Sequence, residues 1–346
     1  MIEVNSRELP LPPHYDSTRA GEIWHPGVAQ LAERARAWRR AHRLAPARDD
    51  TRRVALLLVD MQNSFCVPGF ELFVAGRSGR GAVEDTARLC SFLYRNLGAI
   101  SRIFVTVDSH LPVQIFHPCF WVDRGGRHPN PFTAIRAHEV EEGAWTVAPD
   151  VPAALGLDRL YLEDYARHYT RTLEERGKYA LAIWPYHVLL GSVGHALVPL
   201  VHEAVFFHAI ARASQPSYHP KGNHPLTDHY SVFGPEVERD HLGKTIAPRD
   251  EALLDALLAS DAVVIAGQAK SHCLAWSIDD LLGEIRLRDA RLAEKVYLLE
   301  DCTSPVVVPG ADHTAAADAA FARFRDAGMH VVRSTDPLAD WPGFPG

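Results

Sequence analysis

A short apolar run that leads directly into a helical pattern constrains the fold of this chain more than any other feature. Residues 262–266 read Ala-Val-Val-Ile-Ala, which has the length and composition of a strand buried on both faces. A turn containing Gly267 and Ser271 follows, and apolar side chains then recur at helical spacing from Leu274 to Ile285. The pattern predicts a buried strand, a tight turn and a helix, as in α/β folds.

Cys273 lies where the predicted strand and turn give way to the predicted helix. The first turn of a helix has unpaired N–H groups and a positive dipole potential, which favour a thiolate and can also hold an oxyanion. A free cysteine is, however, among the commonest residues of a protein core. The position of Cys273 alone therefore leaves a structural role open.

Further apolar runs and helical patterns alternate along the chain, which predicts a doubly wound, Rossmann-like α/β domain. The expected strands are 54–59, 103–107, 263–266, 296–299 and 330–332, and the expected helices lie near 83–97, 249–259, 274–288 and 314–327. Residues 204–210 suit either a strand or a helix, and their periodicity does not decide between the two. We predict a mostly parallel six-stranded sheet with helices on both faces.

Two parts of the sequence fall outside this alternation. Residues 1–50 are rich in proline early on and then in alanine and arginine, with a predicted helix over 26–42. We interpret them as an arm that packs on the body or on a neighbouring subunit. Residues 51–346 are expected to form the domain itself. Within it, the pattern weakens over about 119–183, which predicts an insertion, partly helical over 157–178, that covers the site.

Composition and charge exclude several classes of protein. The 346 residues have a formal net charge of −7 and a pI near 6.2, which gives no reason to expect nucleic acid or an anionic membrane as partner. Five dispersed cysteines argue against a disulfide framework. No apolar run approaches the roughly 18 residues that cross a bilayer, and the N-terminus has no signal-peptide pattern. We expect a soluble, cytoplasmic protein, and the arm and insertion predict a homo-oligomer.

Reactive side chains follow the predicted strands at their carboxyl ends, the edge at which α/β sheets place their sites. They are Asp60, Asp108, His110 and Cys273. Asp-x-His at a strand end puts both side chains on one face, and this pair suits zinc, iron or manganese. His187 offers a third ligand. A hydrogen-bonded Asp–His pair without metal is the alternative.

Lys221 lies in the turn-rich segment 219–233, which we expect to be a loop. A lysine in such a segment is usually a surface residue. A functional lysine would instead lie beside Asp60, where its charge would keep the carboxylate ionised and stabilise developing negative charge.

Taken in chain order, these segments resemble the motifs of the isochorismatase-like cysteine hydrolases and, among them, of the nicotinamidases. Residues 59–66, Val-Asp-Met-Gln-Asn-Ser-Phe-Cys, are similar to the first family motif, whose aspartate (here Asp60) is the general base. The segment 221–233 resembles the one that bears the catalytic lysine. Residues 267–273, Gly-Gln-Ala-Lys-Ser-His-Cys, resemble the nucleophile motif, in which a cis peptide (here Gln268–Ala269) helps to shape the oxyanion hole.

Two further segments resemble the halves of the nicotinamidase metal site, namely Asp108-x-His110 and Trp184-Pro-x-His187. The resemblance implies that Asp108, His110 and His187 bind a divalent metal that orients the substrate. Zinc is the first choice, with iron or manganese as alternatives. The resemblance extends from residue 54 to about residue 335, which is most of the chain.

The resemblance implies the chemistry of a small-amide hydrolase. Asp60 would take the proton of Cys273, whose thiolate would attack a carboxamide such as nicotinamide and release ammonia through a thioester. Lys221 would stabilise the anionic members of this catalytic triad, and the N–H groups of Ala269 and Cys273 would hold the oxyanion. Four side chains are expected to contact the substrate: Phe65, Trp184, Tyr230 and Gln268.

The sequence also departs from compact nicotinamidases. His117 is one residue further from His110 than the additional metal-proximal histidine of some members, so we leave it out of the ligand set. Val188 stands where a cysteine usually follows the second metal motif, and Ser64 replaces an acidic residue that is frequent in the first. The insertion over 119–183 has no counterpart in compact members. These differences leave the substrate open.

Three functions therefore remain in view. The first is an amidohydrolase acting on nicotinamide or a related cyclic or aromatic carboxamide. The second keeps the same triad but acts on another small amide, a carbamate or a ureide. The third is a non-catalytic relative that binds a small ligand. An intact triad argues against the third, because ligand binding alone needs no cysteine at that helix start.

Overall fold

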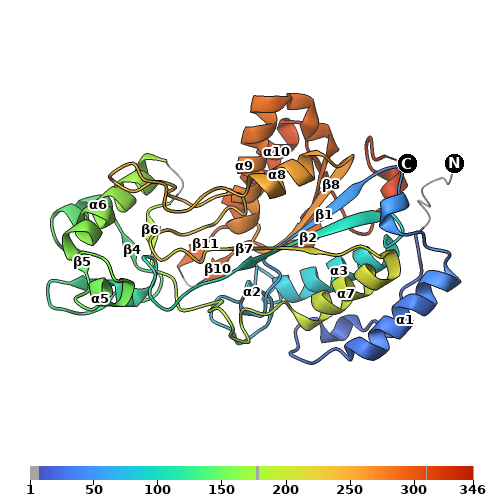
Figure 1. Cartoon of the computed structure of the whole chain (residues 1–346), viewed down its shortest axis with the longest axis horizontal. Coiled ribbons are helices and arrows are strands. Elements are labelled where there is room, and N and C mark those ends of the chain that lie inside the picture. The colour runs from blue at the N-terminus through green and yellow to red at the C-terminus, as the bar shows by residue number, and fades with distance from the viewer. Residues whose placement is uncertain (1–7, 177–178, 309, 346) are drawn as a thin grey trace.

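The centre of the protein is a parallel sheet in the order β12-β9-β8-β1-β2-β7 (Figure 1). The computed structural model describes residues 8–176, 179–308 and 310–345. Every neighbouring pair of strands in this six-stranded sheet is parallel, which confirms the predicted fold class. The strands are β1 (Val54–Val59), β2 (Ile100–Asp108), β7 (Ser217–Lys221), β8 (Ala262–Gly267), β9 (Val296–Leu299) and β12 (His330–Val332).

Alternating side chains of β1 show why the sheet is covered on both faces. Leu56 and Leu58 belong to one apolar core, whereas Ala55, Leu57 and Val59 belong to the other. Figure 1 shows helices on both sides of the sheet. On one side lie α1 (Val28–Ala41), α3 (Gly81–Arg95) and α7 (Pro199–Arg212), and on the other α8 (Glu251–Leu258), α9 (Cys273–Arg288) and α10 (Thr314–Asp326).

The strand order creates a crevice between β1 and β8. From β1 the chain proceeds outward through β2 to β7, and from β8 it proceeds in the opposite direction through β9 to β12. The connections that leave the carboxyl ends of β1 and β8 therefore diverge, and an open α/β sheet binds its ligands at such a point. After β1 the chain forms the short helix α2 (Asn63–Cys66), and after β8 it turns into α9.

Two segments differ from what periodicity alone suggests. Residues 204–210 belong to helix α7, which has Pro199 at its first turn, where a proline costs no helical hydrogen bond. Residues 217–221 form the strand β7 rather than the expected loop. Because β7 is the edge strand of the sheet, Pro220 can occupy it without leaving an inner ladder position unpaired.

The N-terminal segment packs against the same chain. Leu31 and Ala35 of α1 are buried in the core that also contains α7. The carboxylate of Asp50 lies 2.6 Å from the guanidinium of Arg212, which is itself buried at the end of α7. The short helices η1 (Ser17–Arg19) and η2 (Ala47–Asp49) complete this segment.

The segment between β2 and α7 forms a lobe with a core of its own. This lobe projects beyond the carboxyl ends of β2 and β7, at the left of Figure 1. Its largest buried side chains include Trp121, Tyr165 and Tyr169. The lobe contains η3 (Pro118–Phe120), β3 (Trp121–Asp123), β4 (Ala134–Ile135), α4 (Ala137–Glu141), β5 (Trp145–Val147), α5 (Val151–Leu155), α6 (Arg159–Glu175) and β6 (Leu181–Ala182).

The remaining elements are short and lie in the last third of the chain. They are η4 (Ala290–Lys295), η5 (Glu300–Cys302), the hairpin strands β10 (Val307–Val308) and β11 (Ala311–Asp312), and η6 (Leu338–Asp340). Among the described residues, no helix combines the length and the hydropathy that crossing a membrane requires.

Candidate active site

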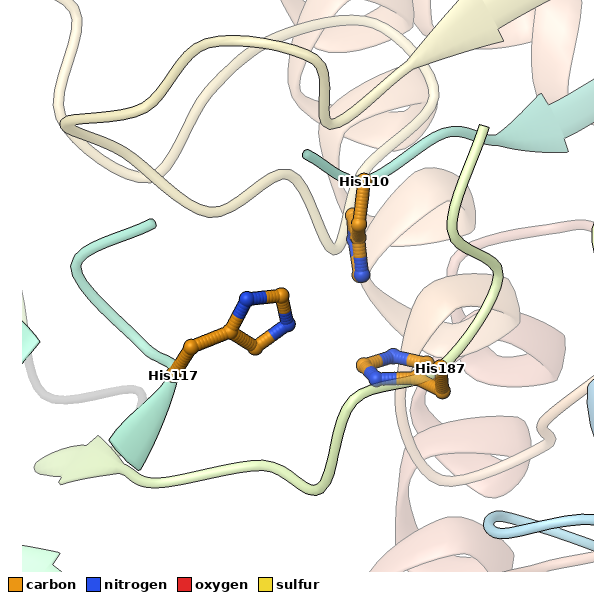
Figure 2. Close-up of side chains that lie close together, drawn as sticks. All are labelled: His110, His117 and His187. Carbon is orange, nitrogen blue, oxygen red and sulfur yellow. The ribbon is translucent and has the colours of Figure 1, made fainter. Parts of the chain in front are cut away.

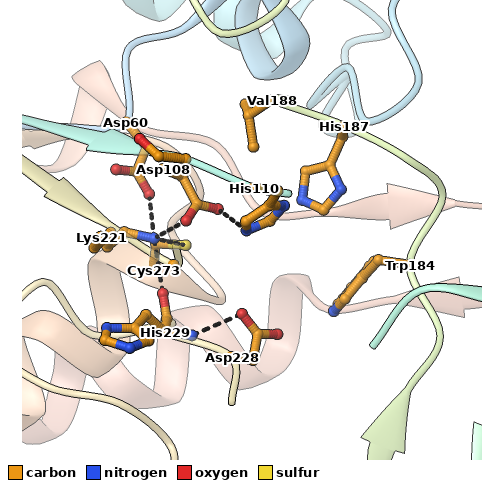
Figure 3. A network of polar contacts seen from close by, with 12 residues as sticks. Asp60, Asp108, His110, Trp184, His187, Val188, Lys221, Asp228, His229 and Cys273 are labelled. Carbon is orange, nitrogen blue, oxygen red and sulfur yellow. Dashed lines mark hydrogen bonds and ion pairs between the residues drawn. The ribbon is translucent and has the colours of Figure 1, made fainter. Parts of the chain in front are cut away.

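Asp60 follows the last residue of β1 and points into the crevice (Figure 3). It is fully buried, and its backbone is in the left-handed region, with φ +48°. Thr106 fixes it twice, because the hydroxyl accepts the Asp60 N–H at 3.0 Å and donates to Oδ1 at 2.6 Å. Burial raises the pKa of the Asp60 carboxyl, against the opposing charge of Lys221. The carboxyl is thereby prepared to hold a proton.

Lys221 ends β7 and brings its ammonium between two carboxylates. Its Nζ lies 3.0 Å from Asp60 Oδ2 and 3.0 Å from Asp108 Oδ1, and it donates to the carbonyl of His229 at 2.7 Å. Burial alone would lower the pKa of Lys221, but the carboxylates raise it well above its usual value. Lys221 therefore stays charged, as the sequence predicts for a functional lysine.

Cys273 is the first residue of α9, and its Sγ lies 3.6 Å from Lys221 Nζ. The carboxyl of Asp60 also interacts with the thiol. Burial raises the pKa of the thiol well above its usual value, and the carboxylates of Asp60 and Asp108 add to this effect while Lys221 opposes it. The expectation that the helix start favours a thiolate is therefore wrong for the resting site, where the thiol keeps its proton beside its acceptor.

The turn before α9 presents two N–H groups to the crevice. The peptide bond Gln268–Ala269 is cis, as the family resemblance implies. Among the described residues, the N–H groups of Ala269 and Cys273 have no hydrogen-bond acceptor, and both residues line the cavity. Gly267 has φ +129°, and a Cβ there would overlap the carbonyl of Val59, so only glycine fits. This turn supplies the donors of a possible oxyanion site.

Gln268 lines the cavity, but its side-chain amide is bound elsewhere. Its Nε2 donates to Asp85 Oδ2 on α3 at 2.9 Å, and its Oε1 accepts the Ser304 N–H at 3.4 Å. Asp85 is itself held by Arg88 at 2.8 Å. This side chain ties the turn to α3 and to the segment after β9, and its contact with substrate stays a prediction.

Asp108 ends β2 and is fixed through its backbone by Gln62 of the first motif. The amide of Gln62 accepts the Asp108 N–H at 2.8 Å and donates to the Asp108 carbonyl at 2.8 Å. The carboxylate lies between Lys221 and His110, with Oδ2 3.1 Å from His110 Nε2. Although burial opposes ionisation, the charges of His110 and Lys221 hold the pKa of this carboxyl well below its usual range.

Gly222 allows Asp108 and His110 to pack this closely. Replacing Gly222 tests whether this packing supports turnover. A Cβ at Gly222 would overlap Asp108 Oδ1 and lie 3.0 Å from the His110 ring, and the residue has φ +76°. We expect Gly222→Ala to displace both side chains and to lower amide turnover by about 10- to 100-fold, as loss of supporting contacts does in metal sites. The matched control is Gly126→Ala, which has φ +77° and no atom within 4 Å of the new Cβ. Equal turnover in the two variants would contradict this account.

Three buried histidines gather next to Asp108 (Figure 2). One ring nitrogen each from His110, His117 and His187 lies within 4.8 Å of the others. His117 comes from the segment that leads into the lobe, and sequence reasoning left it out of the ligand set. Asp108, which sequence reasoning included, reaches this cluster through its contact with His110.

The protonation of these rings suits a metal. His117 Nδ1 lies 3.1 Å from the Pro112 carbonyl and His187 Nδ1 lies 2.7 Å from the Pro185 carbonyl, so the other nitrogen of each ring offers a lone pair. Burial lowers the pKa of His117 to about 4 and that of His187 well below its usual value. Buried His117 Nε2 and His110 Nδ1 have no hydrogen-bond partner within the described parts of the chain, while His110 Nε2 lies 3.1 Å from Asp108 Oδ2. Such orphaned nitrogens fit a divalent cation.

The cavity above Cys273 has an aromatic wall. Phe65, Trp184 and Tyr230 line it, as the family resemblance implies. Trp184 donates its indole N–H to the Tyr230 hydroxyl at 3.0 Å, which fixes both rings. The Phe65 ring lies 5.7 Å from that of His187. A flat ring of a small ligand would be held between these side chains with one edge toward the histidines.

The structure brings to the site two residues that sequence reasoning did not single out, although one of them, Asp228, lies within the segment 221–233. Tyr179, just before β6, donates its hydroxyl to the Ser271 carbonyl at 3.0 Å and stacks on His272 with ring centroids 5.2 Å apart. These contacts hold the lobe against the turn that precedes Cys273. Asp228 lines the cavity as a buried carboxylate. Neither residue has a spacing signal in the sequence, because their contacts depend on how the lobe folds back.

Comparison with known proteins agrees with this geometry. No family model matches the chain. The nicotinamidase of Escherichia coli (strain K12) is 25% identical over 291 residues, which cover 83% of this chain and 96% of that protein. Among solved structures, an Acinetobacter baumannii nicotinamidase/pyrazinamidase is 20% identical with a TM-score of 0.49, covering 83% of this chain and 99% of that one.

A yeast nicotinamidase bound to the inhibitor nicotinaldehyde is 18% identical with a TM-score of 0.49, covering 81% of this chain and 99% of that one. The sequence match to the bacterial nicotinamidase spans nearly that whole protein. The chain is therefore similar to a nicotinamidase over most of its length, and its motifs resemble those of the isochorismatase-like cysteine hydrolases.

Proposed function

We propose that the protein is a cysteine amidohydrolase that converts a small aromatic or cyclic carboxamide, such as nicotinamide, to the acid and ammonia. The observation that carries this proposal is the position of Lys221 Nζ, 3.0 Å from Asp60 and 3.6 Å from Cys273 at the crevice of the sheet. The relation to nicotinamidase supports a hydrolase acting on C–N amide bonds. A structural role alone would not require three ionisable groups buried in contact.

In the first half of the proposed reaction, the Cys273 thiol transfers its proton to Asp60 as the sulfur attacks the amide carbon. A C–S bond forms, and the carbonyl oxygen becomes an oxyanion that accepts the N–H groups of Ala269 and Cys273. The intermediate then collapses. The C–N bond breaks, and Asp60 returns the proton to the leaving nitrogen, so that ammonia departs and a thioester remains.

In the second half, Asp60 takes a proton from water while the water oxygen attacks the thioester carbon. Collapse of this second intermediate breaks the C–S bond, the acid leaves, and Cys273 regains its proton from Asp60. Lys221 remains charged throughout and stabilises whichever of Asp60 and Cys273 is anionic. The raised pKa of Asp60 suits a group that must both accept and return a proton.

The metal centre is proposed to consist of His110, His117 and His187 with Asp108. A divalent metal bound there would supply a Lewis acid that holds a ring nitrogen of the substrate and so orients the carboxamide toward Cys273. The chain's own contribution is a fixed set of imidazoles, and carbonyl groups set the orientation of two of them, His117 and His187.

Metal content tests the inclusion of His117. Wild-type protein, dialysed against metal-free buffer and measured by plasma mass spectrometry, is expected to retain close to one divalent metal per chain. His117→Ala is expected to weaken metal affinity by about 10- to 100-fold or more, because it removes a ligand. His138→Ala, an exposed histidine on α4, is the control. Unchanged metal content in His117→Ala would remove this residue from the site.

Ammonia release tests the proposed function itself. Purified protein is expected to release ammonia from nicotinamide at an enzyme-like rate, and removal of the metal with a chelator is expected to abolish release until metal is restored. Absence of release from nicotinamide and from its close ring analogues would contradict the proposal of an aromatic amide as substrate.

A further inference from the structure

Among the described residues, the cavity above Cys273 is lined by carboxylates and by two histidines, His187 and His272, but by no lysine or arginine. Among the described residues that line it, the charged side chains are Glu71, Asp108 and Asp228. Asp108 is neutralised by its contacts with Lys221 and His110. The described residues form no ion pair with Asp228, and its carboxylate therefore favours a ligand group that donates hydrogen bonds.

Asp228 is the member of this set that is both buried and incompletely bonded. Its exposed fraction is 6%, and its Oδ1 accepts the backbone N–H of His229 at 2.7 Å. The second carboxylate oxygen has no hydrogen-bond partner within the described residues, and Figure 3 shows it pointing away from His229. A carboxylate oxygen that faces the cavity without a protein donor can accept a charge-assisted hydrogen bond from a ligand's N–H group.

The backbone of Asp228 is held rigidly on both sides. Its N–H donates to the hydroxyl of Tyr169 in the lobe at 3.2 Å, and its carbonyl accepts the N–H of Glu236 at 2.8 Å. The carboxylate itself is held by the His229 N–H through Oδ1. Burial raises the pKa of Asp228 to about 6, so the group is mainly ionised at pH 7 and above.

We propose that Asp228 selects substrates that carry an N–H donor in addition to the reacting carboxamide, such as an amino-substituted heteroaromatic amide. This inference rests on the proposed function, in that it places the substrate ring against Trp184 and Tyr230 with its carboxamide at Cys273. The donor on the ring would then reach the free oxygen of Asp228. A site built to bond a substrate N–H rejects the analogue that lacks it far more strongly than an apolar pocket does.

The test compares nicotinamide with its 2-amino, 5-amino and 6-amino derivatives. With the wild-type enzyme, at least one amino derivative is expected to exceed nicotinamide in kcat/KM by about tenfold or more, the effect of one hydrogen bond to a charged group. If no amino derivative exceeds nicotinamide while nicotinamide is hydrolysed, the inference fails and the proposed function stands.

Asp228→Asn replaces the free carboxylate oxygen, a hydrogen-bond acceptor, by a donor group with little change in side-chain shape. The asparagine oxygen can still accept the His229 N–H, which leaves an NH₂ donor where the carboxylate offered an acceptor. The preference for the amino derivative is expected to fall by about tenfold or more and to approach or drop below one. The control Asp164→Asn makes the same charge change on the exposed face of α6 and should keep the wild-type preference. An unchanged preference in Asp228→Asn would overturn the inference.

Binding to a variant without the nucleophile separates this inference from the proposed function. Calorimetric titration of Cys273→Ala with the same four amides needs no turnover. The wild type could hydrolyse none of the amides while Cys273→Ala binds an amino derivative about tenfold more tightly than nicotinamide. If adding Asp228→Asn then removes this binding preference, the proposed reaction is wrong and the proposed selectivity is right. If none of the amides binds, both are wrong.

Discussion

Cys273→Ala is expected to abolish ammonia release, by at least about 1,000-fold, while the protein folds and still binds its amide. The sulfur is the only atom removed, and it lies in the crevice 3.6 Å from Lys221 at the start of α9. Without it no C–S bond forms, and Asp60 has no thiol to deprotonate. The measurement is ammonia release under saturating amide, together with circular dichroism and calorimetric binding.

The matched control for this variant is Cys90→Ala. Cys90 is also buried and free, but it packs in α3 on the opposite side of the sheet from α9. This control should keep wild-type turnover apart from a small loss of stability. Substantial ammonia release by Cys273→Ala would contradict a covalent mechanism, and equal losses in both variants would point to a general effect of removing a buried thiol.

Lys221→Met should produce the second large effect, because it removes both catalytic charge and a structural ion. The ammonium is buried between Asp60 and Asp108, at 3.0 Å from each. Removing one partner of a buried ion pair typically costs about 3–5 kcal/mol, since it leaves the remaining charge uncompensated. We expect the free energy of unfolding to fall by this amount at pH 8, measured by urea titration with tryptophan fluorescence, and turnover to fall at least about 100-fold.

The loss of unfolding free energy in Lys221→Met should change with pH in a defined direction. Burial already raises the pKa of Asp60 in the folded protein, and loss of the opposing ammonium would raise it further. A carboxyl whose folded pKa exceeds its unfolded pKa destabilises the protein as the pH rises through the folded value. The stability deficit of Lys221→Met relative to the wild type should therefore be smaller at pH 5.5 than at pH 8.

A double variant separates the ion pair from a packing defect. In Lys221→Met with Asp60→Asn, one of the two unpaired charges is gone, so part of the lost stability should return at pH 8 although the enzyme stays inactive. Wild-type stability of the single variant at pH 8, or no recovery in the double variant, would contradict the buried charge network.

The fold could be predicted from the sequence because its strands are short, apolar and regularly separated by helices. Leu56 and Leu57 face opposite cores, so β1 is apolar at every position and reads clearly as a buried strand. The edge strand β7 has no such pattern. Its residues Tyr218 and His219 meet solvent or polar neighbours, and only pairing with β2 makes the segment a strand.

The candidate site could be predicted in part for the same reason. Asp60, Asp108 and Cys273 end or follow strands of one parallel sheet, and topology alone brings such positions to one edge. His117 could not be placed, because it lies in irregular chain whose path is set by the lobe. A count of residues from His110 therefore proved a poor guide to its distance from that ring.

The protonation state of Cys273 was beyond sequence reasoning for a different reason. A helix N-terminus favours a thiolate, but full burial and two nearby carboxylates act at closer range and raise the thiol pKa. Their positions depend on long-range packing of β1, β2 and β7. The free oxygen of Asp228 depends in the same way on the lobe, which holds its backbone through Tyr169.

Rapid acid quenching during turnover of nicotinamide, followed by mass analysis of the proteolysed enzyme, tests the central claim most directly. The account predicts that the peptide containing Cys273 carries the mass of the substrate less that of ammonia, and that the adduct disappears as the amide is exhausted. Modification of a different residue, or an unmodified Cys273 peptide at every quench time while ammonia is released, would contradict it.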